Sequence, residues 1–401
     1  MDKIKIGLYI HIPFCIKKCG YCDFLSMPAG ESTRRHYVAA LIREIQDKSK
    51  CLPGYQLSSV FFGGGTPSLL AGAQVAGLME AVGQNFSLDP DAEVTIECNP
   101  GTLDRQKLLQ YKSAGFNRLS IGLQSTHNKE LEKLGRAHTY EDFLKSYDLA
   151  RKAGFGNINI DLMSALPGQT VWDWIYTLER VIKLKPEHIS AYSLMIEEGT
   201  PFFALYGEDG QRRDRGEMPR FLPDEEAERK MYSMACRMLG EKGYKRYEIS
   251  NYARPGQECR HNIGYWRRTP YLGLGLGSAS LLGNVRFSNT VSLQGYLEGD
   301  YGDLEVLLQG GQGGYPSRAV SWLDKKQQME EFMFLGLRMM DGISRKEFRE
   351  TFGVELEGVY GAAVKDMSRQ GLLSQQFGRV FLTEEGVSVS NYVMGQFLLE
   401  D

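Results

Sequence analysis

Three cysteines within eight residues are the clearest chemical signal in the chain. Cys15, Cys19 and Cys22 follow an apolar stretch with the spacing Cys-x3-Cys-x2-Cys. Three thiolates in one short loop can hold three corners of an iron–sulfur cubane and leave the fourth iron open to an exchangeable ligand. S-adenosylmethionine (SAM) can chelate such an iron through its amino and carboxylate groups, and one electron from the cluster then cleaves its sulfonium to a 5′-deoxyadenosyl radical. The loop therefore predicts a [4Fe-4S] site that binds SAM.

A zinc site is the alternative use of this loop. Structural zinc requires four closed ligands, so His11 or Cys51 would have to complete the tetrahedron. Zinc loops usually carry paired x2 spacings, and the sequence holds no second pair. The spacing thus favours iron–sulfur over a zinc-stabilised binding module. The total of seven cysteines is odd and does not resemble a disulfide framework.

The elements that must position this loop repeat along the first 200 residues, each a short apolar strand followed by an amphipathic helical stretch. The predicted strands cover residues 6–13, 59–62, 93–97, 118–123, 157–162 and 188–194. This alternation is typical of a parallel sheet. Unusual residues lie at or just past the ends of five successive strands, namely Cys15, Gly64, Gly65, Glu97, Gln124 and Asp161. Functional groups that converge at one rim favour an α/β fold with a partial (β/α)6 barrel over a doubly wound sheet.

The chain divides into four predicted parts. The barrel core takes residues 1–200, a barrel-capping region residues 201–297, and a glycine-rich linker or surface loop residues 298–318. Residues 319–401 form a small unit in which helices at 325–340, 345–352 and 359–370 precede a hairpin at 372–383 and a last helix. That order predicts a winged-helix-like domain. Its presumed recognition helix carries few basic residues, Lys365 and Arg369, so packing or partner docking is the expected role.

Composition limits the class of protein. Lys and Arg number 47 against 50 Asp and Glu, a net charge of −3, so nucleic acid is not an expected partner. The N-terminal residues alternate like a strand instead of forming the apolar core of a signal peptide. No segment approaches the ~20 apolar residues of a membrane-spanning helix. We expect a cytoplasmic protein with at most peripheral membrane association.

Several motifs together resemble the radical SAM superfamily, in its coproporphyrinogen-dehydrogenase-like branch. The opening of the chain, YIHIPFCIKKCGYCDF, carries the strongest likeness. Further matching segments are FFGGGTPSLL, TIECNPGTL, RLSIGLQS, LGRAH, NIDLMSALPGQT, AYSLMIEEGTPF and the terminal domain, so the likeness covers nearly the whole chain.

The resemblance implies cluster ligation by the three loop cysteines and a set of SAM contacts. These contacts are Tyr9, Tyr21, Gly64, Gly65, Thr66, Glu97, Gln124, Arg136, Asp161, Met195 and Ala279. In the pattern of the branch, Tyr21 shields the adenine, and the glycines let the backbone approach the methionine amino group. Gln124 and Arg136 reach the ribose and the carboxylate, and Asp161 faces a ribose hydroxyl.

Within that branch, the likeness favours HemW-type heme chaperones over coproporphyrinogen III oxidases. The oxidases carry a further cysteine and a longer N-terminal extension, whereas Asp23 and Phe24 follow Cys22 and eight residues precede Tyr9. Residues 259–266 read CRHNIGYW, which contains the HNxxYW element of the HemW type. Imidazole or thiolate can ligate heme iron and aromatic rings can stack on a porphyrin. The implied heme residues are Cys259, His261, Tyr265 and Trp266, with the imidazole or the thiol as iron ligand.

The expected function is thus a radical SAM-type heme chaperone with a [4Fe-4S] cluster, SAM and heme as its ligands. The expected partners are heme, client hemoproteins and an electron donor for the cluster, and a homodimer remains open. The alternative is a radical enzyme that acts on tetrapyrrole propionates. His11, His138 and His188 have no paired spacing and are interpreted as structural, and GLGLGSAS at 273–280 as a turn bordering the barrel.

Overall fold

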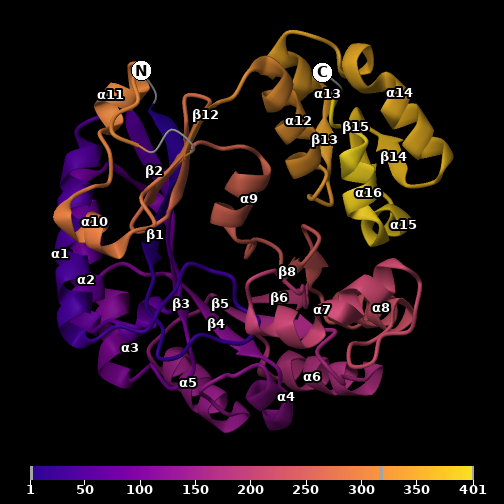
Figure 1. The fold of residues 1–401 in the computed structure, drawn as a ribbon, viewed down its shortest axis with the longest axis horizontal. Helices are drawn as coiled ribbons and strands as arrows, with labels where there is room; N and C mark the ends of the chain where they lie inside the picture. Colours follow the sequence, from indigo (N-terminus) through magenta and orange to yellow (C-terminus); the bar gives the residue numbers. More distant parts are fainter. Residues whose placement is uncertain (1–2, 316–318, 400–401) are drawn as a thin grey trace.

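Six parallel strands form the centre of the computed structural model, which describes residues 3–315 and 319–399. They lie side by side in sequence order (Figure 1): β1 (Ile4–Ile12), β2 (Tyr55–Gly64), β3 (Leu88–Cys98), β4 (Arg118–Gln124), β5 (Ile158–Ser164) and β6 (His188–Ser193). Each pair in this series is parallel, so all six carboxyl ends reach the same rim. The predicted partial (β/α)6 barrel is confirmed.

A layer of helices covers the outside of these strands, which explains why the strands are apolar on both faces. The helices are α1 (Glu31–Ser49), α2 (Gly72–Asn85), α3 (Arg105–Ser113), α4 (Asn128–Lys133), α5 (Tyr140–Lys152) and α6 (Val171–Leu184). Capping boxes start two of them, because Thr139 and Thr170 accept from the backbone three residues on. Among the described helices, none combines the length and the hydropathy of a membrane span.

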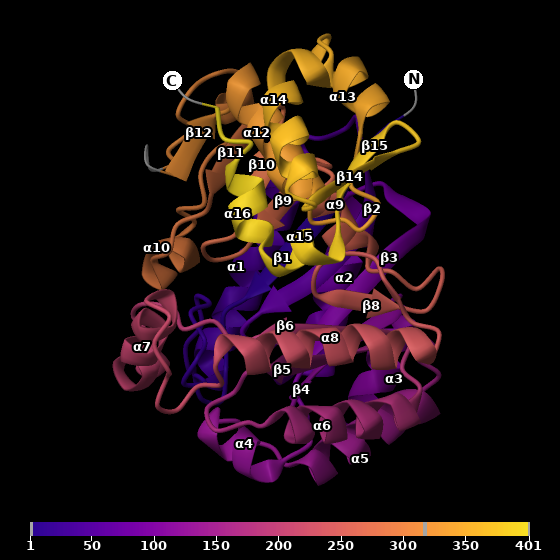
Figure 2. The same cartoon turned by 90° about the vertical axis from the view of Figure 1, so that its right-hand side faces the viewer.

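Two further helices follow the barrel. They are α7 (Pro201–Asp214) and α8 (Glu225–Glu241). The segment between them contains Gly216, with φ +70°, and the prolines Pro219 and Pro223, which interrupt helical hydrogen bonding. Figure 2 shows α6 and α8 running alongside each other over β5 and β6.

The region after the barrel extends the sheet at both edges. Beyond β1, the sheet continues through β9 (Tyr271–Leu274), β10 (Ala279–Leu282), β11 (Val285–Ser288) and β12 (Val320–Trp322). Beyond β6 it continues through β8 (Asn251–Ala253) and β7 (Lys245–Arg246). The glycine-rich segment 273–280 makes the turn from β9 to β10, as predicted. Its Gly275 and Gly277 have positive φ. Strands from residues 201–297 therefore extend the barrel sheet at both edges.

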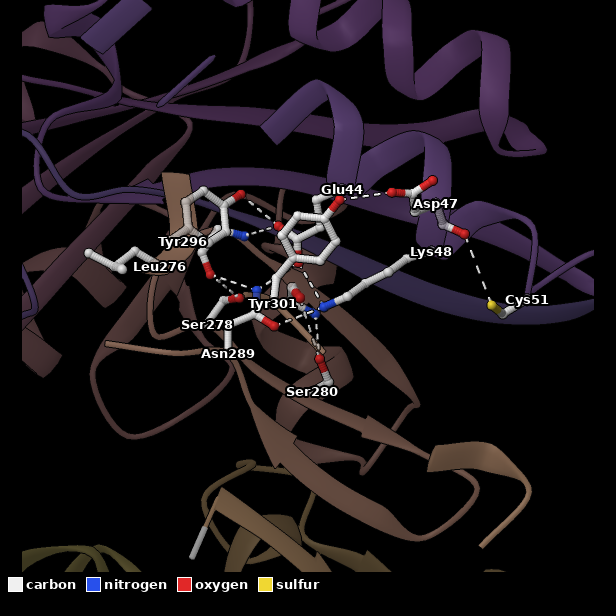
Figure 3. A network of polar contacts seen from close by, with 12 residues as sticks. Glu44, Asp47, Lys48, Cys51, Leu276, Ser278, Ser280, Asn289, Tyr296 and Tyr301 are labelled. Atoms are coloured by element: carbon white, nitrogen blue, oxygen red, sulfur yellow. Dashed lines mark hydrogen bonds and ion pairs between the residues drawn. The ribbon is translucent and has the colours of Figure 1, made fainter. Parts of the chain in front are cut away.

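A buried polar network joins this extension to α1 (Figure 3). Lys48 and Glu44 are at most 2% exposed and form an ion pair of 2.7 Å. Asn289 accepts from Lys48 Nζ at 2.8 Å and donates to Glu44 Oε1 at 2.6 Å. Glu44 Oε2 also accepts from the Tyr296 hydroxyl at 2.7 Å and from the backbone of Gly275 at 2.8 Å. Because removing one partner would strand a buried charge, the network ties the β9–β11 segment firmly to α1.

Residues 298–315 are more ordered than the glycine content of the predicted linker suggests. Residues 298–315 follow α10 (Leu293–Glu298) and contain α11 (Leu304–Leu308), while 316–318 lie outside the described residues. Leu304, Leu307 and Tyr315 are buried in the main core. Three apolar side chains therefore anchor residues 298–315 to the main core.

The C-terminal unit has its own core and its own three-stranded sheet. Its elements are α12 (Lys325–Gly336), β13 (Ile343–Ser344), α13 (Arg345–Phe352), α14 (Leu356–Arg369), β14 (Leu373–Gln376), β15 (Arg379–Leu382), α15 (Glu384–Ser388) and α16 (Ser390–Gly395). This order matches the predicted winged-helix-like arrangement. Figure 1 shows the short helix α9 (Arg260–Trp266) between this unit and the barrel.

Candidate functional site

A cavity of about 340 Å³ lies at the rim where the barrel strands end. It is bordered by all three loop cysteines and by eight of the residues that the sequence predicts as SAM contacts. These are Cys15, Cys19, Cys22, Tyr21, Gly64, Gly65, Thr66, Glu97, Gln124, Arg136 and Asp161. The structure thus brings together residues from β2, β3, β4, β5 and three loops.

The cysteine loop is held at both ends by backbone hydrogen bonds. Cys15 N donates to Met27 O at 3.1 Å, and Met27 N donates back to Pro13 O at 2.8 Å. In the middle of the loop, Gly20 N donates to Leu134 O and Gly20 O accepts from Phe202 N. A side chain at Gly20 would lie 2.6 Å from the Phe202 ring, so only glycine fits this close approach. The three half-buried thiols therefore face one cavity from a fixed loop.

A chain of polar side chains runs around the cavity from one cysteine to another. The Thr66 hydroxyl donates to Cys15 Sγ at 3.6 Å and accepts from Asn99 Nδ2 at 2.8 Å. Arg136 Nη2 donates to Asn99 Oδ1 at 2.7 Å, and its Nη1 donates to Cys19 Sγ at 3.8 Å. Hydrogen bonds and positive charge near sulfur stabilise thiolates and tune an iron–sulfur cluster. The donor set fits a cluster held by three thiolates.

The glycines at the end of β2, Gly64 and Gly65, leave no room for side chains. A Cβ at Gly65 would lie 2.8 Å from Phe14 O and 3.1 Å from Cys15 Sγ. Gly64 has φ +112°, and a Cβ there would lie 2.5 Å from the His11 ring. A smooth backbone wall therefore stands next to the cysteine loop, where a ligand can approach the main chain.

Two carboxyl groups, those of Glu97 and Asp161, border the cavity. Glu97 accepts from the backbone of Gly64 at 3.1 Å, and its depth in the barrel, together with the nearby Asp161, raises its pKa to about 8. Burial also raises the pKa of Asp161, although Asn159 donates to it at 2.8 Å and Ser120 at 3.0 Å. At neutral pH the cavity therefore holds a largely protonated Glu97 beside Asp161.

Gln124 ends β4 in the left-handed region, with φ +73°. A non-glycine residue rarely adopts this conformation, and such positions cluster at ligand sites. Tyr21 packs edge-on against Phe202, and burial raises the pKa of its hydroxyl. Both residues border the cavity.

Three predicted SAM contacts do not border this cavity. Met195 is 67% exposed and lies away from it. Ala279 lies on β10 and borders a second cleft, together with Tyr9. Tyr9 stands near the wall between the two spaces, because the Cβ position of Gly63 is 3.0 Å from its ring and 3.2 Å from Glu97 Oε2. Position along the strand order alone does not show which side of the wall a residue borders.

Cys259 and His261, the predicted heme ligands, are buried at the start of α9. The Cys259 thiol donates to Glu93 Oε1 at 3.4 Å, and burial raises its pKa to about 12. His261 shares Nδ1 with Ser59 Oγ at 2.9 Å and Nε2 with the Tyr265 hydroxyl at 3.0 Å. Burial lowers the pKa of His261 to about 3, so its imidazole is neutral. His261 and Tyr265 therefore lie in contact on one face of α9.

Tyr265 and Trp266 are half-buried and border the second cleft, of about 570 Å³, between the barrel and α12. Any ligation of iron by His261 would have to replace its bond to Tyr265. Ligation by Cys259 would require the enclosed thiol to leave Glu93.

Sequence reasoning missed Asn99, Ser120 and Tyr192, which also border the rim cavity. Asn99 follows Glu97 by two residues in a matching segment, so its place at a strand end was available as a signal. Ser120 and Tyr192 lie within β4 and β6, where their side chains look like ordinary strand positions.

The residues that could complete a zinc site have other partners. His11 bonds to the Tyr9 hydroxyl and to Leu25 O, each at 2.9 Å. Cys51 follows α1 and its sulfur bonds to Asp47 O. Within residues 3–315 and 319–399, no group of three or more His, Cys, Asp or Glu side chains is arranged around a single metal ion. His188 is structural as expected, since Asn159 and Tyr247 bond to its two nitrogens.

Comparison with known proteins agrees with this geometry. The model of the Radical SAM superfamily matches residues 9–181, and that of the HemN C-terminal domain matches residues 323–389. The heme chaperone HemW of Bacillus subtilis (strain 168) is 36% identical over 393 residues, which cover 98% of this chain and 99% of that protein. This chain belongs to the HemW family of radical SAM proteins. Membership of the radical SAM class implies SAM and a [4Fe-4S] cluster as cofactors.

Other HemW relatives and one solved structure extend the likeness. The heme chaperone HemW of Escherichia coli (strain K12) is 33% identical, with 98% of each chain covered. Radical S-adenosyl methionine domain-containing protein 1, mitochondrial, of Danio rerio is 35% identical over 92% of this chain and 81% of its own. The structure of the Escherichia coli coproporphyrinogen III oxidase HemN, a radical SAM enzyme, aligns with a TM-score of 0.79 at 23% identity over 99% of this chain and 91% of that one. That likeness establishes the shared fold.

Proposed function

We propose that this protein is a heme chaperone that binds heme beside a SAM-ligated [4Fe-4S] cluster and passes it to client hemoproteins. One observation carries the proposal: α9 presents Tyr265 and Trp266 to an aromatic cleft that also contains Tyr9. Tyr9 lies near the wall that separates this cleft from the rim cavity. Aromatic faces of this kind can stack on a porphyrin. The full-length HemW relatives bear the name of heme chaperones, which supports the same function.

In this proposal Cys15, Cys19 and Cys22 hold the cluster, and the rim cavity receives SAM. The glycine wall at Gly64 and Gly65 would take the methionine end, close to the cysteine loop. The side chains that would contact the rest of the ligand are Tyr21, Thr66, Glu97, Gln124, Arg136 and Asp161. When bound, SAM on the open iron of the cluster supplies a radical source upon one-electron reduction.

The protein's own residues would keep this site dry and ordered. Arg136 closes the cavity between Asn99 and Cys19, and its Nη2 also donates to Gly122 O at 2.8 Å. A largely protonated Glu97 can donate a hydrogen bond, whereas a carboxylate could only accept.

For heme, His261 is the better of the two proposed iron ligands. Its imidazole is neutral and its Nε2 points to Tyr265, which itself borders the cleft. Cys259 is fully enclosed and its thiol is protonated at neutral pH. An electron donor for the cluster and client hemoproteins complete the proposed set of partners.

A heme titration monitored by Soret absorbance tests the proposal with wild type, His261→Ala and Cys259→Ala. We expect wild type to bind heme, His261→Ala to shift the band and weaken binding, and Cys259→Ala to match wild type. Unchanged spectra in both variants would remove the ligand assignment. Failure of wild type to bind heme, or robust CO2 release from coproporphyrinogen III, would contradict the chaperone function.

A further inference from the structure

The cleft between the barrel extension and α12 contains a charged group as well as aromatic walls. Its volume of about 570 Å³ lies in the range of small-molecule sites, ~300–1,000 Å³. Tyr265 and Trp266 come from α9, and Arg268 follows them directly after the helix. Arg286 on β11 and Glu331 on α12 border the same cleft.

Arg268 is an unusual residue for this place. Its side chain is only 9% exposed, and its Nε donates to Glu331 Oε2 at 2.9 Å. Its Nη2 is buried and has no hydrogen-bond partner among the described residues. A buried guanidinium donor without an acceptor costs free energy unless a ligand supplies one.

The backbone conformation of Arg268 also costs free energy. Its φ is +52°, in the left-handed region that glycine or asparagine normally fills at the end of a helix. Hydrogen bonds from Arg268 N to Tyr265 O at 3.2 Å and from Thr269 N to Gly264 O at 2.8 Å fix the turn. The chain therefore places an arginine where another residue would be less strained.

The cations of the cleft exceed its acids. Arg268 and Arg286 both bind the single carboxylate of Glu331, the latter through Nη2 at 2.7 Å. The other Arg286 nitrogen, Nη1, donates to the Tyr271 hydroxyl at 3.1 Å. Trp266 Nε1 is a second buried donor without a partner among the residues that the structure describes. Two guanidinium groups on one carboxylate leave an uncompensated positive charge beside aromatic walls.

We propose that Arg268, assisted by Arg286, is the receptor for a carboxylate of a planar aromatic ligand held in this cleft. Under the proposed function, on which this inference rests, the ligand is heme and the carboxylate is a propionate. Guanidinium binds carboxylate with paired, charge-assisted hydrogen bonds. Glu331 is then the internal competitor, whose carboxylate holds the two arginines when no ligand is bound.

The test compares two neighbouring arginines and two forms of one ligand. Arg268→Asn keeps a residue that tolerates the left-handed region. Arg267→Asn is the matched control, because Arg267 is exposed and pairs with Asp341 at 2.9 Å outside the cleft. Each full-length protein is titrated with heme and with heme dimethyl ester, whose propionates are neutral.

We expect Arg268→Asn to weaken heme binding by roughly 10-fold to 100-fold and Arg267→Asn to leave it unchanged. The ester should bind wild type and Arg268→Asn equally. Glu331→Gln should strengthen heme binding about 3-fold to 10-fold, a gain that misfolding cannot imitate.

Equal heme affinity in Arg268→Asn and wild type, equal affinity of wild type for heme and its ester, or weaker binding by Glu331→Gln would overturn the carboxylate receptor. These results would leave the chaperone proposal intact, because wild type would still bind heme. Absence of heme binding by wild type would overturn both.

Discussion

The rim cavity and the buried start of α9 both contain thiols near charged side chains, yet they offer a metal different access. The thiols of Cys15, Cys19 and Cys22 are half-buried and face one cavity. Cys259 is fully buried, and its thiol is hydrogen-bonded to Glu93. Burial raises the pKa of Cys22 as well as that of Cys259, but a coordinating metal deprotonates a thiol that it can reach. Access therefore separates the two regions.

Strand β3 contributes one carboxylate to each region. Glu93 is 4% exposed and accepts from Cys259 Sγ and from the backbone nitrogens of Arg260 and His261, each of the latter at 3.1 Å. Glu97 faces the rim cavity and accepts from one backbone nitrogen, that of Gly64. The first acid holds a helix in place, whereas the second is available to a ligand.

The largest expected effect concerns the cluster. Replacement of Cys15, Cys19 or Cys22 by alanine should abolish the iron–sulfur absorption and the acid-labile sulfide of anaerobically reconstituted protein, because each thiolate holds one iron. Cys259→Ala should retain wild-type iron and sulfide content. A cluster that survives loss of the loop cysteines, or that is lost in Cys259→Ala, would contradict the assignment of the metal site to the rim cavity.

Removal of the acid beneath α9 should cost more stability than any change at the rim. Glu93→Ala leaves three donors without their acceptor and removes a negative charge near the buried Arg118 guanidinium. We expect a loss of ~3–5 kcal/mol in the free energy of unfolding, measured by denaturant titration. Cluster content per folded molecule should stay at the wild-type level. A loss below ~1 kcal/mol would mean that Glu93 does not hold α9.

The acid at the rim, Glu97, should destabilise the folded protein near neutral pH, whereas Glu93 should stabilise it. The pKa of Glu97 is about 8 in the folded protein and near 4.5 when unfolded. A raised carboxyl pKa means that the unfolded chain releases its proton first, so the stability of cluster-free protein should fall as the pH rises from 4.5 to about 8. Glu97→Gln should remove on the order of 2 kcal/mol of that decline, since the site is partly open to solvent. Thermal unfolding across this pH range, with wild type as reference, measures the difference, and parallel pH curves would contradict the assignment.

The smallest effect should come from Met195. Because this side chain is 67% exposed and lies away from the rim cavity, Met195→Ala should change SAM affinity by no more than about twofold. Arg136→Ala, which opens the cavity wall, should weaken SAM binding at least about tenfold. Isothermal titration of the reconstituted protein compares them. A large effect at Met195 would place it in the site despite its exposure.

Local patterns were sufficient to predict the rim. A strand that ends in a polar or glycine residue has its carboxyl end at the same edge as its parallel neighbours, so Gly64, Glu97 and Asp161 could be grouped without coordinates. The winged-helix order followed from helical periodicity and hairpin spacing in the same way.

The sequence by itself determined the three-thiol loop, the six strand and helix units, and the aromatic pair on α9, because these depend on neighbours a few residues apart. Only the tertiary structure decided that Cys259 and His261 are enclosed, and that Arg268 and Arg286 meet Glu331. His261 N reaches Glu93 across 168 positions, and Arg268 reaches Glu331 across 63. Burial and charge pairing arise from such distant contacts, and no local spacing encodes them.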